Sequence, residues 1–402
     1  MPHDPLHGRP RLIRRTRRSL RGTRVPAGRL GADRQPLRAT RGWLRADLGL
    51  FLGAGGLSLV GVLLIWSSTR VDHGSSLAVK QLVSAVGGLA AALVVVRLDM
   101  RFLRALAPLV SVLSVLGLLA VLSSLGATVN GSRSWIRLPG GFTLQPSELA
   151  KVALALGLAM VLADRADRGE PQRTRDVLLA WLVAAVPIGL VLLQPDLGSA
   201  VVLVAMAAVA VASAGAPRRF TLGVVAGGVA GLVAAFTTPV LSGYQRARLL
   251  AFLQPELDPQ GIGYQTRQVR IAIGSGGLGG QGLFAGRQTQ GGFIPFQETD
   301  FIFSVAGEEL GFLGAAGLVL LVGFLVVRAL VVARRADAFG RLLATAVAVW
   351  FGIQAFENIG MNLGLMPVTG LPLPFVSYGG SSMVAAWIAL GLVGNVAASG
   401  RR

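Results

Sequence analysis

The feature that most limits what this chain can fold into is a series of apolar stretches about as long as a lipid bilayer is thick. A membrane-spanning helix needs about 20 mostly apolar residues, and within lipid it satisfies all its own backbone polar groups. We therefore predict an all-α integral membrane protein that crosses the bilayer about ten times. The predicted spans lie near residues 46–67, 79–98, 103–124, 147–164, 176–194, 198–214, 219–240, 300–328, 342–364 and 378–397.

Composition supports a membrane protein and excludes several other classes. Hydrophobic residues make up 53% of the chain and charged residues only 14%, whereas a soluble protein has about 25% charged residues. The net charge is +19, and the basic residues that produce it lie between the apolar stretches and at the N-terminus. This placement indicates membrane topology and no nucleic-acid partner. The chain has no cysteine and three histidines outside the predicted spans. Disulfides and thiolate chemistry are excluded, and Ser-His-Asp catalysis is disfavoured.

Arginines in the connections predict the orientation. Connections rich in Lys and Arg stay in the cytoplasm, and here the even-numbered connections carry the basic residues if the N-terminus is cytoplasmic. An even number of spans places the C-terminus inside as well. The arginines that support this N-in/C-in topology are Arg97, Arg101, Arg165, Arg168, Arg173, Arg175, Arg218, Arg219, Arg328, Arg334, Arg335, Arg341, Arg401 and Arg402.

Two regions stand apart from the spans. Residues 1–44 are rich in Arg, Pro and Gly and lack apolar periodicity, so we predict a disordered cytoplasmic arm. This arm either lies on anionic membrane lipids or is a variable tail that only helps to fix orientation. The ten-helix domain would run over 45–398, with a large extracellular loop at 241–299 between helices 7 and 8. Since loops longer than about 15 residues are usually functional or disordered, and this one has regularly spaced apolar positions, we expect folded interfacial structure there.

Three charged residues near the predicted outer surface are candidates for function, because ionisable residues at membrane depth are costly. Glu148 and Lys151 are three residues apart on the fourth span, so they share one helix face and can form an ion pair. The alternative is a pair that only orients the helix. Asp196 lies at the turn between the fifth and sixth spans, where it either serves the site or caps the sixth helix.

A fourth candidate, Asp300, heads the predicted eighth span. Partial desolvation there is expected to raise its pKa towards that of a general base, and the alternative is again an N-cap. Glu308 lies two turns further along and either shares the cavity of Asp300 or ties helices together; the second is favoured. Glu357, Asn358 and Asn362 form a polar stripe on the ninth span, interpreted as interhelical hydrogen bonding.

Five ordered motifs on the predicted outer side resemble the shape, elongation, division and sporulation (SEDS) family over residues 45–398. The proline-rich stretch Pro367–Phe375 looks more like RodA, the elongation member, than FtsW, the division member. The motifs occupy residues 145–151 (QPSELAK), 194–198 (QPDLG), 244–277 (from YQR through GYQ to IGSGG), 299–311 (TDFIF followed by EELG) and 366–382 (MPVTGLPLPF followed by SYGGSS).

The resemblance implies a peptidoglycan glycosyltransferase that polymerises lipid II at the outer face of the bacterial plasma membrane, with inversion at the sugar, during cell elongation. It also implies a class B penicillin-binding protein, a transpeptidase, as partner. Asp300 would be the essential carboxylate, and Glu148 and Lys151 an essential pair. The residues expected to bind substrate are Arg246, Arg248, Asp196, Gln145, Ser377 and Tyr378.

The residues suit this chemistry. An acceptor hydroxyl needs a general base, the role expected of Asp300. The departing diphosphate gains negative charge, which fixed cations stabilise; Lys151, Arg246 and Arg248 are the candidates. No cofactor is certain, and the alternative to these cations is a divalent ion (Mg or Mn) bound by Asp300 or Glu148.

Three other functions are compatible with the sequence. One is a flippase or other transporter of lipid-linked precursors, although a transporter places its charges near the middle of the membrane, whereas Glu148, Asp196 and Asp300 gather at the outer edge. Another is a scaffold that recruits a transpeptidase without catalysis. The last is an FtsW-like division polymerase, which has the same chemistry and a different partner complex.

Overall fold

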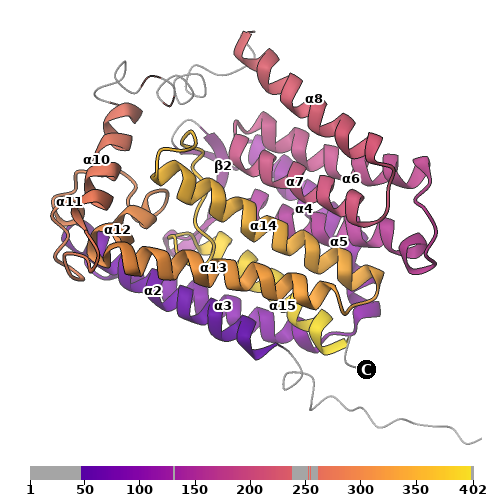
Figure 1. Ribbon diagram of the computed structural model, residues 1–402, viewed down its shortest axis with the longest axis horizontal. Coiled ribbons are helices and arrows are strands. Elements are labelled where there is room, and N and C mark those ends of the chain that lie inside the picture. Colours follow the sequence, from indigo (N-terminus) through magenta and orange to yellow (C-terminus); the bar gives the residue numbers. More distant parts are fainter. Residues whose placement is uncertain (1–46, 130–131, 238–251, 253, 255–260, 400–402) are drawn as a thin grey trace, which may run out of the picture. The chain divides into compact units, whose positions relative to one another are not determined.

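The computed structural model describes residues 47–399, apart from 130–131, 238–251, 253 and 255–260 (Figure 1). All of these belong to the compact unit Ala39–Arg402. The predicted arm, residues 1–44, lies outside the described residues and stays a prediction.

Helices account for most of the described fold. Eight of the described helices are long and apolar enough to cross a bilayer: α2 (Leu48–His73), α3 (Ser76–Arg97), α4 (Met100–Leu122), α5 (Pro146–Asp167), α6 (Thr174–Leu193), α13 (Gly311–Ala333), α14 (Ala338–Asn362) and α15 (Gly380–Ser399). The shorter α7 (Leu197–Ser213) and then α8 (Arg218–Thr237) occupy the sixth and seventh predicted spans. The predicted fold class is confirmed, and the total of ten crossings stays a prediction.

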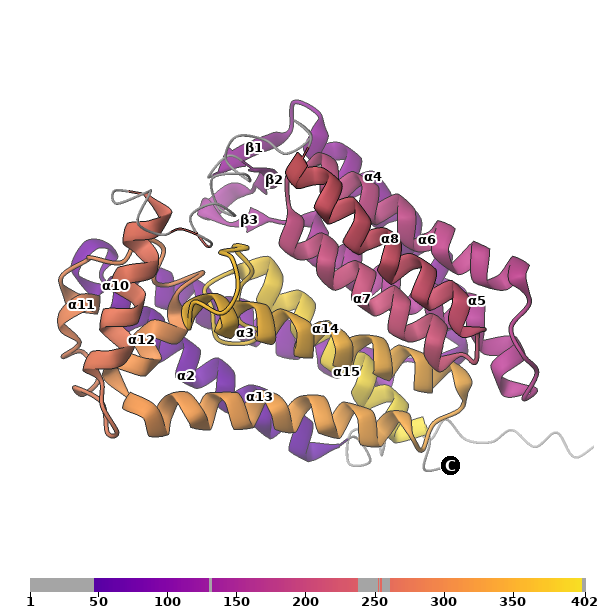
Figure 2. The same ribbon diagram turned by 45° about the horizontal axis from the view of Figure 1, so that its top comes forward.

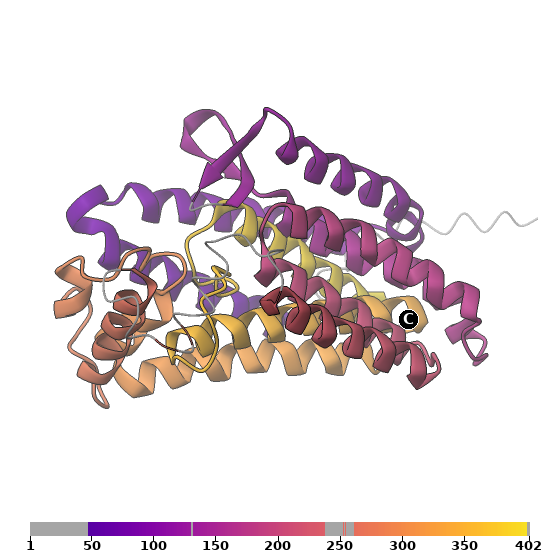
Figure 3. The same cartoon turned by 90° about the horizontal axis from the view of Figure 1, so that it is seen from above.

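Burial separates central helices from peripheral ones. In the most apolar stretch of α5, 83% of the residues are buried, and the value for α14 and α15 is 72%, whereas it is only 17% for α4. Helix α5 contacts α4, α6, α7, α14 and α15, and α14 contacts α5, α7, α13 and α15; these helices run alongside one another in Figures 2 and 3. The exposed leucines, valines and phenylalanines of the peripheral helices suit contact with lipid tails.

Helices α3 and α15 approach each other closely because both carry glycine at the contact. A Cβ atom on Gly391 would come within 2.7 Å of the Cα atom of Ala92, and one on Gly88 within 2.9 Å of the Trp387 ring. Small residues allow helix backbones to meet in this way in membranes. The close contact fixes α15, whose first residues belong to the last of the five motifs.

The segment between α4 and α5 forms a small antiparallel sheet that was not predicted from the sequence. Its strands are β1 (Gly126–Val129), β2 (Ser132–Arg137) and β3 (Thr143–Leu144), in the order β1-β2-β3. Gly126 is opposite Ile136, and Arg137 is opposite Thr143. Ser132 donates a hydrogen bond to the carbonyl of Gln194 (2.6 Å), so the sheet rests on the turn before α7.

The predicted start of the eighth span, given as 300–328, is wrong. The structure divides it into the short helix α12 (Ile302–Glu309) and the long helix α13, because Gly311 adopts a left-handed conformation with φ of 68°. The first N–H groups of α13 bind the preceding loop rather than α12: Phe312 donates to the carbonyl of Gly277 (2.9 Å) and Leu313 to that of Leu278 (3.1 Å). With eight residues, α12 is too short to cross a bilayer.

The described part of the large loop contains helical structure. It contains α10 (Ile262–Ser275) and the single turn α11 (Arg287–Gln290). A small hydrophobic cluster, separate from the core between the spanning helices, joins α10 to the segment before α12 and to the end of α14. Its buried members are Val269, Ala272, Ile294, Phe301, Met361 and Val368.

We predict that Gly311→Ala destabilises the protein whereas Gly317→Ala, a matched change within α13, does not. A Cβ atom at position 311 would lie 2.2 Å from the backbone nitrogen of Gly280, while one at position 317 meets nothing within 4 Å. A left-handed conformation costs a residue with a Cβ atom roughly 1–2 kcal/mol, whereas Ala within a helix is favoured over Gly by about 1 kcal/mol. Thermal unfolding in one detergent measures both, and equal stability of the two variants would contradict the prediction.

Candidate active site

The predicted pair Glu148–Lys151 forms a fully buried ion pair on α5. The Nζ atom of Lys151 lies 2.7 Å from Oε1 of Glu148, and both side chains have 0% exposure. The same Nζ atom donates to Oε1 of Gln354 on α14 (2.7 Å) and lies 5.2 Å from the ring centre of Trp350. A buried charge is tolerated only when it is paired and hydrogen-bonded. Lys151 meets both conditions, and Glu148 is paired through its Oε1 atom.

The enclosure of Lys151 changes the role expected for it. Its ammonium group is occupied by Glu148, Gln354 and the Trp350 ring, and it has no exposed surface. In this arrangement it does not reach a diphosphate in solvent. The contact it makes with Gln354 instead ties the outer end of α5 to α14.

Asp300 lies in the turn directly before α12 and is half-buried. Helix α12 begins at Ile302 with Phe301 as its N-cap and without a side-chain cap, so the N-cap alternative for Asp300 is wrong. Two asparagines of α14 donate to the backbone carbonyl of Asp300, Asn358 over 3.0 Å and Asn362 over 3.1 Å. The asparagines of the polar stripe on α14 therefore hydrogen-bond the turn that carries Asp300.

Asp196 caps α7, as the alternative for it proposed. Its Oδ1 atom accepts a hydrogen bond from the N–H of Ser199 (3.0 Å). Asp196 also interacts electrostatically with Glu357 of α14, which is 2% exposed and interacts with Lys151 as well. Lys151 on α5 and Asp196 at the start of α7 thus both lie within electrostatic reach of Glu357. The predicted substrate residues Arg246 and Arg248 lie outside the described residues.

Ser377 and Tyr378 lie in a segment that is held to α3 and to the Asp300 region. The hydroxyl of Ser377 accepts from the N–H of Leu373 (2.8 Å), so it stabilises a turn. The N–H of Tyr378 donates to the carbonyl of Glu298 (2.8 Å), which places Tyr378 beside the segment that leads to Asp300. Burial, and secondarily the charge of Glu298, raise the pKa of the Tyr378 phenol.

Gln145 is positioned by the start of α15. Its N–H donates to the hydroxyl of Ser381 (3.0 Å), which in turn donates to the carbonyl of Thr143 (2.8 Å). The residue is partly buried at the N-cap position of α5, without a side-chain capping bond. The first and last of the five motifs therefore meet in space.

The sequence analysis missed two glutamines that organise the site. Gln354 contacts Lys151, as described above, and Gln81 on α3 is 0% exposed. Gln81 donates to the carbonyl of Ser377 (2.8 Å) and accepts from the N–H of Gly379 (3.1 Å). A signal for Gln354 was present, since it lies four residues before Asn358, on the same face of the helix.

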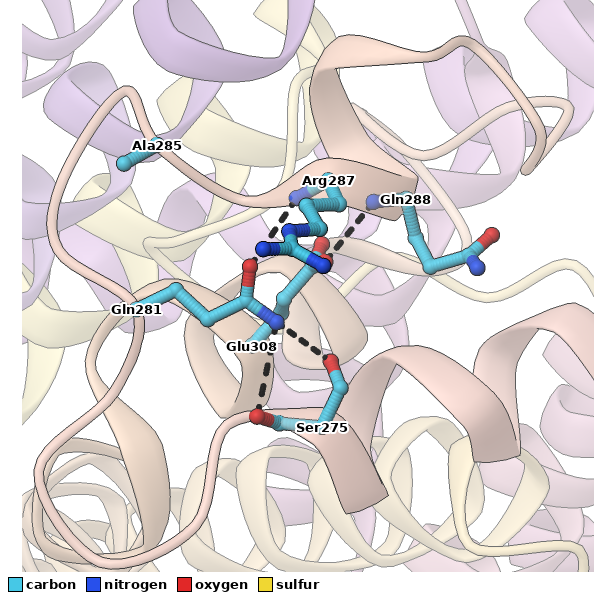
Figure 4. A pocket seen from close by; sticks show the side chains of 6 residues that line it. All are labelled: Ser275, Gln281, Ala285, Arg287, Gln288 and Glu308. Atoms are coloured by element: carbon cyan, nitrogen blue, oxygen red, sulfur yellow. Dashed lines mark hydrogen bonds between the residues drawn. The ribbon is translucent and has the colours of Figure 1, made fainter.

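A polar pocket of about 550 Å³ lies between α10, α11 and α12 (Figure 4). Glu308 contributes to its lining and accepts hydrogen bonds from α11: the N–H of Gln288 (2.7 Å), the N–H of Thr289 (2.9 Å) and the Thr289 hydroxyl (2.7 Å). Glu308 therefore ties α12 to α11, the alternative that the sequence favoured. The residues that line the pocket are Ser275, Gln281, Ala285, Arg287, Gln288 and Glu308.

The neighbouring Glu309 ties α12 to α2. Its Oε1 atom accepts from the Ser67 hydroxyl (2.6 Å) and from the Gln290 amide (3.3 Å). The side chain is 1% exposed. This burial raises the pKa of the Glu309 carboxyl, although hydrogen bonds from Ser67 and other neighbours oppose the shift.

A divalent ion such as Mg²⁺ or Mn²⁺ prefers oxygen ligands, chiefly carboxylates. Within the described ranges, no group of three or more His, Asp or Glu side chains is arranged to hold one. Glu148, proposed as a ligand, has one carboxylate oxygen engaged by Lys151. The reaction proposed below assigns no step to a metal ion.

Comparison with known proteins decides the family. The family described as cell cycle protein, covering FtsW, RodA and SpoVE, matches residues 44–402. The chain belongs to the SEDS family. A relative named probable peptidoglycan glycosyltransferase FtsW, from Trichlorobacter lovleyi, is 39% identical over 360 residues, which are 88% of this chain and 93% of the relative. A protein of the same name from Mycobacterium tuberculosis is 38% identical over 350 residues, 85% of this chain and 66% of that protein.

Solved SEDS structures share the fold. The rod shape determining protein RodA of Thermus thermophilus superposes with a TM-score of 0.66 at 34% identity, covering 88% of this chain and 97% of that one. A chain from a peptidoglycan synthase complex, in a structure that addresses the coordination of polymerization and crosslinking, gives a TM-score of 0.75 at 36% identity, covering 90% of this chain and all of that one. With its apolar helices, this SEDS protein is a multi-pass protein of the bacterial plasma membrane.

We predict that Lys151→Met destabilises the protein by about 3–5 kcal/mol, because it leaves the Glu148 carboxylate buried and unpaired. The double variant Glu148→Gln/Lys151→Met removes both charges and should be more stable than the single variant. Breaking the surface pair Arg104–Asp164 with Asp164→Asn, where Asp164 is 69% exposed, should cost only about 0–1 kcal/mol. Thermal or denaturant unfolding measures all three, and a double variant no more stable than Lys151→Met would contradict the prediction.

A second prediction concerns pH. The raised pKa of Glu309 means that the folded protein keeps a proton that the unfolded chain loses above the ordinary value of 4.5. The free energy of unfolding then falls as pH rises from about 4.5 towards the pKa of the folded state. Glu309→Gln should reduce this fall, whereas Glu170→Gln, at an exposed carboxylate between α5 and α6, should not. Melting temperatures across pH 4.5–7 test this, and parallel curves for wild type and Glu309→Gln would disprove it.

Proposed function

We propose that this SEDS protein polymerises lipid II into glycan strands at the outer face of the plasma membrane, as an inverting peptidoglycan glycosyltransferase. The observation that carries the proposal is the convergence of distant motifs on the outer half of α14. Asn358 and Asn362 bind the Asp300 segment, and Gln354 binds Lys151. The names of the relatives and the family match support the same activity.

Asp300 is the general base of the proposed reaction. A half-buried carboxylate at the outer surface can accept the proton of an acceptor sugar hydroxyl while that hydroxyl attacks the lipid-linked sugar. Because the displacement inverts the sugar, one base is sufficient and no covalent enzyme intermediate is required. The leaving diphosphate needs positive charge, and we assign this role to Arg246 and Arg248, since Lys151 is enclosed.

We further propose that the protein works with a class B penicillin-binding protein, which crosslinks the new strands. The likeness to a chain of a peptidoglycan synthase complex supports such a partner. The stretch Pro367–Phe375 favours the elongation role of RodA. The division role of FtsW is the alternative, with the same chemistry and a different partner complex.

The test is polymerisation of labelled lipid II by the purified protein together with its candidate transpeptidase. Asp300→Asn keeps the size of the side chain and removes the base, so it should lower the rate by about 10²–10⁴-fold. Asp72→Asn, at an exposed carboxylate near the outer end of α2, is the matched control and should polymerise at the wild-type rate. Gel separation of glycan products measures the rates.

The outcomes separate the competing functions. Polymer from wild type and from Asp72→Asn, with none from a folded Asp300→Asn, supports the polymerase. Polymer from all three removes Asp300 as the essential base. No polymer from wild type with its partner, but movement of lipid II across vesicle membranes, would establish a flippase instead.

A further inference from the structure

Three amide side chains form a row along the outer half of α14. Gln354, Asn358 and Asn362 are four residues apart, so they lie one above the other on one face of the helix. Their exposures are 2%, 0% and 0%. Buried amides need hydrogen-bond partners. Two of the partners of these three lie on α14 itself, Trp350 and the carbonyl of Asn358, and the others lie on other segments of the site.

The inner end of the row holds the ion pair. Oε1 of Gln354 accepts from Nζ of Lys151 (2.7 Å) and from the indole N–H of Trp350 (2.7 Å). The amide nitrogen of Gln354 donates to the carbonyl of Pro372 (2.8 Å). One side chain therefore joins α5, α14 and the proline-rich segment.

The outer end of the row holds the Asp300 segment. Asn358 donates to the carbonyls of Asp300 (3.0 Å) and Leu371 (2.8 Å). Asn362 donates to the same Asp300 carbonyl (3.1 Å) and accepts from the N–H of Ser304 in α12 (3.1 Å). The turn that carries the proposed base is thus fastened by its backbone, which leaves the Asp300 carboxylate to other contacts.

We propose that this amide row is a positioning device that fixes the distance between Asp300 and the Glu148–Lys151 pair, with Asn358 as its central residue. Asn358 connects the two ends, because it binds Asp300 on one side and, through the adjacent carbonyls of Leu371 and Pro372, the segment that Gln354 holds. The row lies on α14, one of the most buried helices of the fold, so its amides are carried by a rigid element. The inference rests on the proposed polymerase function.

The amide row sets the position of Asp300 and takes no part in proton transfer. Misplacement of a reacting group by about 1 Å can cost on the order of 10²-fold in rate. Loss of the row should therefore lower kcat and leave the affinity for lipid II unchanged. A contribution only to overall stability would instead lower the melting temperature without lowering kcat of the folded protein.

The variant Asn358→Leu tests this, because leucine has a similar volume and no amide. The matched control is Asn395→Leu on α15. Asn395 is 2% exposed, and its amide likewise donates to backbone carbonyls, those of Val95 (2.8 Å) and Leu98 (2.7 Å), at the opposite end of the helices. Both variants remove a buried amide that fastens a chain segment to a helix, so both should lower the melting temperature.

The expected result is a fall in kcat for Asn358→Leu on the order of 10²-fold, with KM within about twofold of wild type, and a kcat for Asn395→Leu close to wild type. An equal kcat for the two variants, or a change in KM alone, overturns the proposal. If Asn358→Leu fails to fold, Asn362→Ala takes its place, since it removes one of the two donors to the Asp300 carbonyl; it should lower kcat more than Asn395→Leu does.

A second measurement does not depend on activity. The chain has no cysteine, so spin labels can be attached to cysteines introduced at Leu125 and Pro295, both exposed. Leu125 follows α4, which packs against α5, and Pro295 precedes the Asp300 turn. The distance distribution between the two labels should broaden in Asn358→Leu and stay narrow in wild type and Asn395→Leu. A distribution unchanged in all three overturns the proposal.

The two proposals can fail separately. Wild-type protein that fails to polymerise lipid II would refute the proposed function, while the spin-label distances would still decide whether the row positions the turn.

Discussion

The buried ion pair between Glu148 and Lys151 is the interaction on which the outer half of the structure depends. Two charges removed from water are tolerated only with excellent geometry and further hydrogen bonds, and Gln354 and the Trp350 ring supply these for Lys151. The requirement draws α14 against α5 at a defined position along both helices. Helix α14 also carries Asn358 and Asn362, which bind the Asp300 turn. The contact between the ion pair on α5 and α14 therefore helps to place Asp300, although Asp300 is distant in the sequence.

The large outer loop is organised by a second set of buried carboxylates. Glu308 holds the backbone of α11, and Glu309 holds Ser67 on α2. Both belong to α12, whose other end is held by Asn362 through Ser304. The short helix that follows Asp300 is therefore fastened at both ends to helices of the membrane domain. A site built in this way has its reactive group on a loop and its rigidity from helices, which suits chemistry on a substrate headgroup just outside the lipid tails.

Sequence reasoning succeeded where the physical cause is local and failed where it is not. The apolar stretches predicted the spanning helices because lipid imposes the same requirement on each helix separately, and a separation of three residues predicted the contact between Glu148 and Lys151. The start of the span predicted at 300–328 was wrong because the apolar pattern continues across Gly311, where a left-handed backbone conformation ends one helix and begins the next. The role of Gln81 was missed because its partners, Ser377 and Gly379, lie 296 and 298 residues further along the chain.

The sequence by itself determined that this chain is a helical membrane protein with its candidate chemistry on the outer side, because hydropathy, the placement of arginines and the order of the motifs are properties of the chain read along its length. Only the tertiary structure decided what those residues do for one another. It enclosed Lys151, made Asp196 a helix cap, separated Asp300 from the helix it was expected to begin, and placed three amides between the ion pair and the Asp300 turn. The reason is that buried polar groups must be satisfied by whichever partners the fold brings near, and packing chooses those partners across the whole chain.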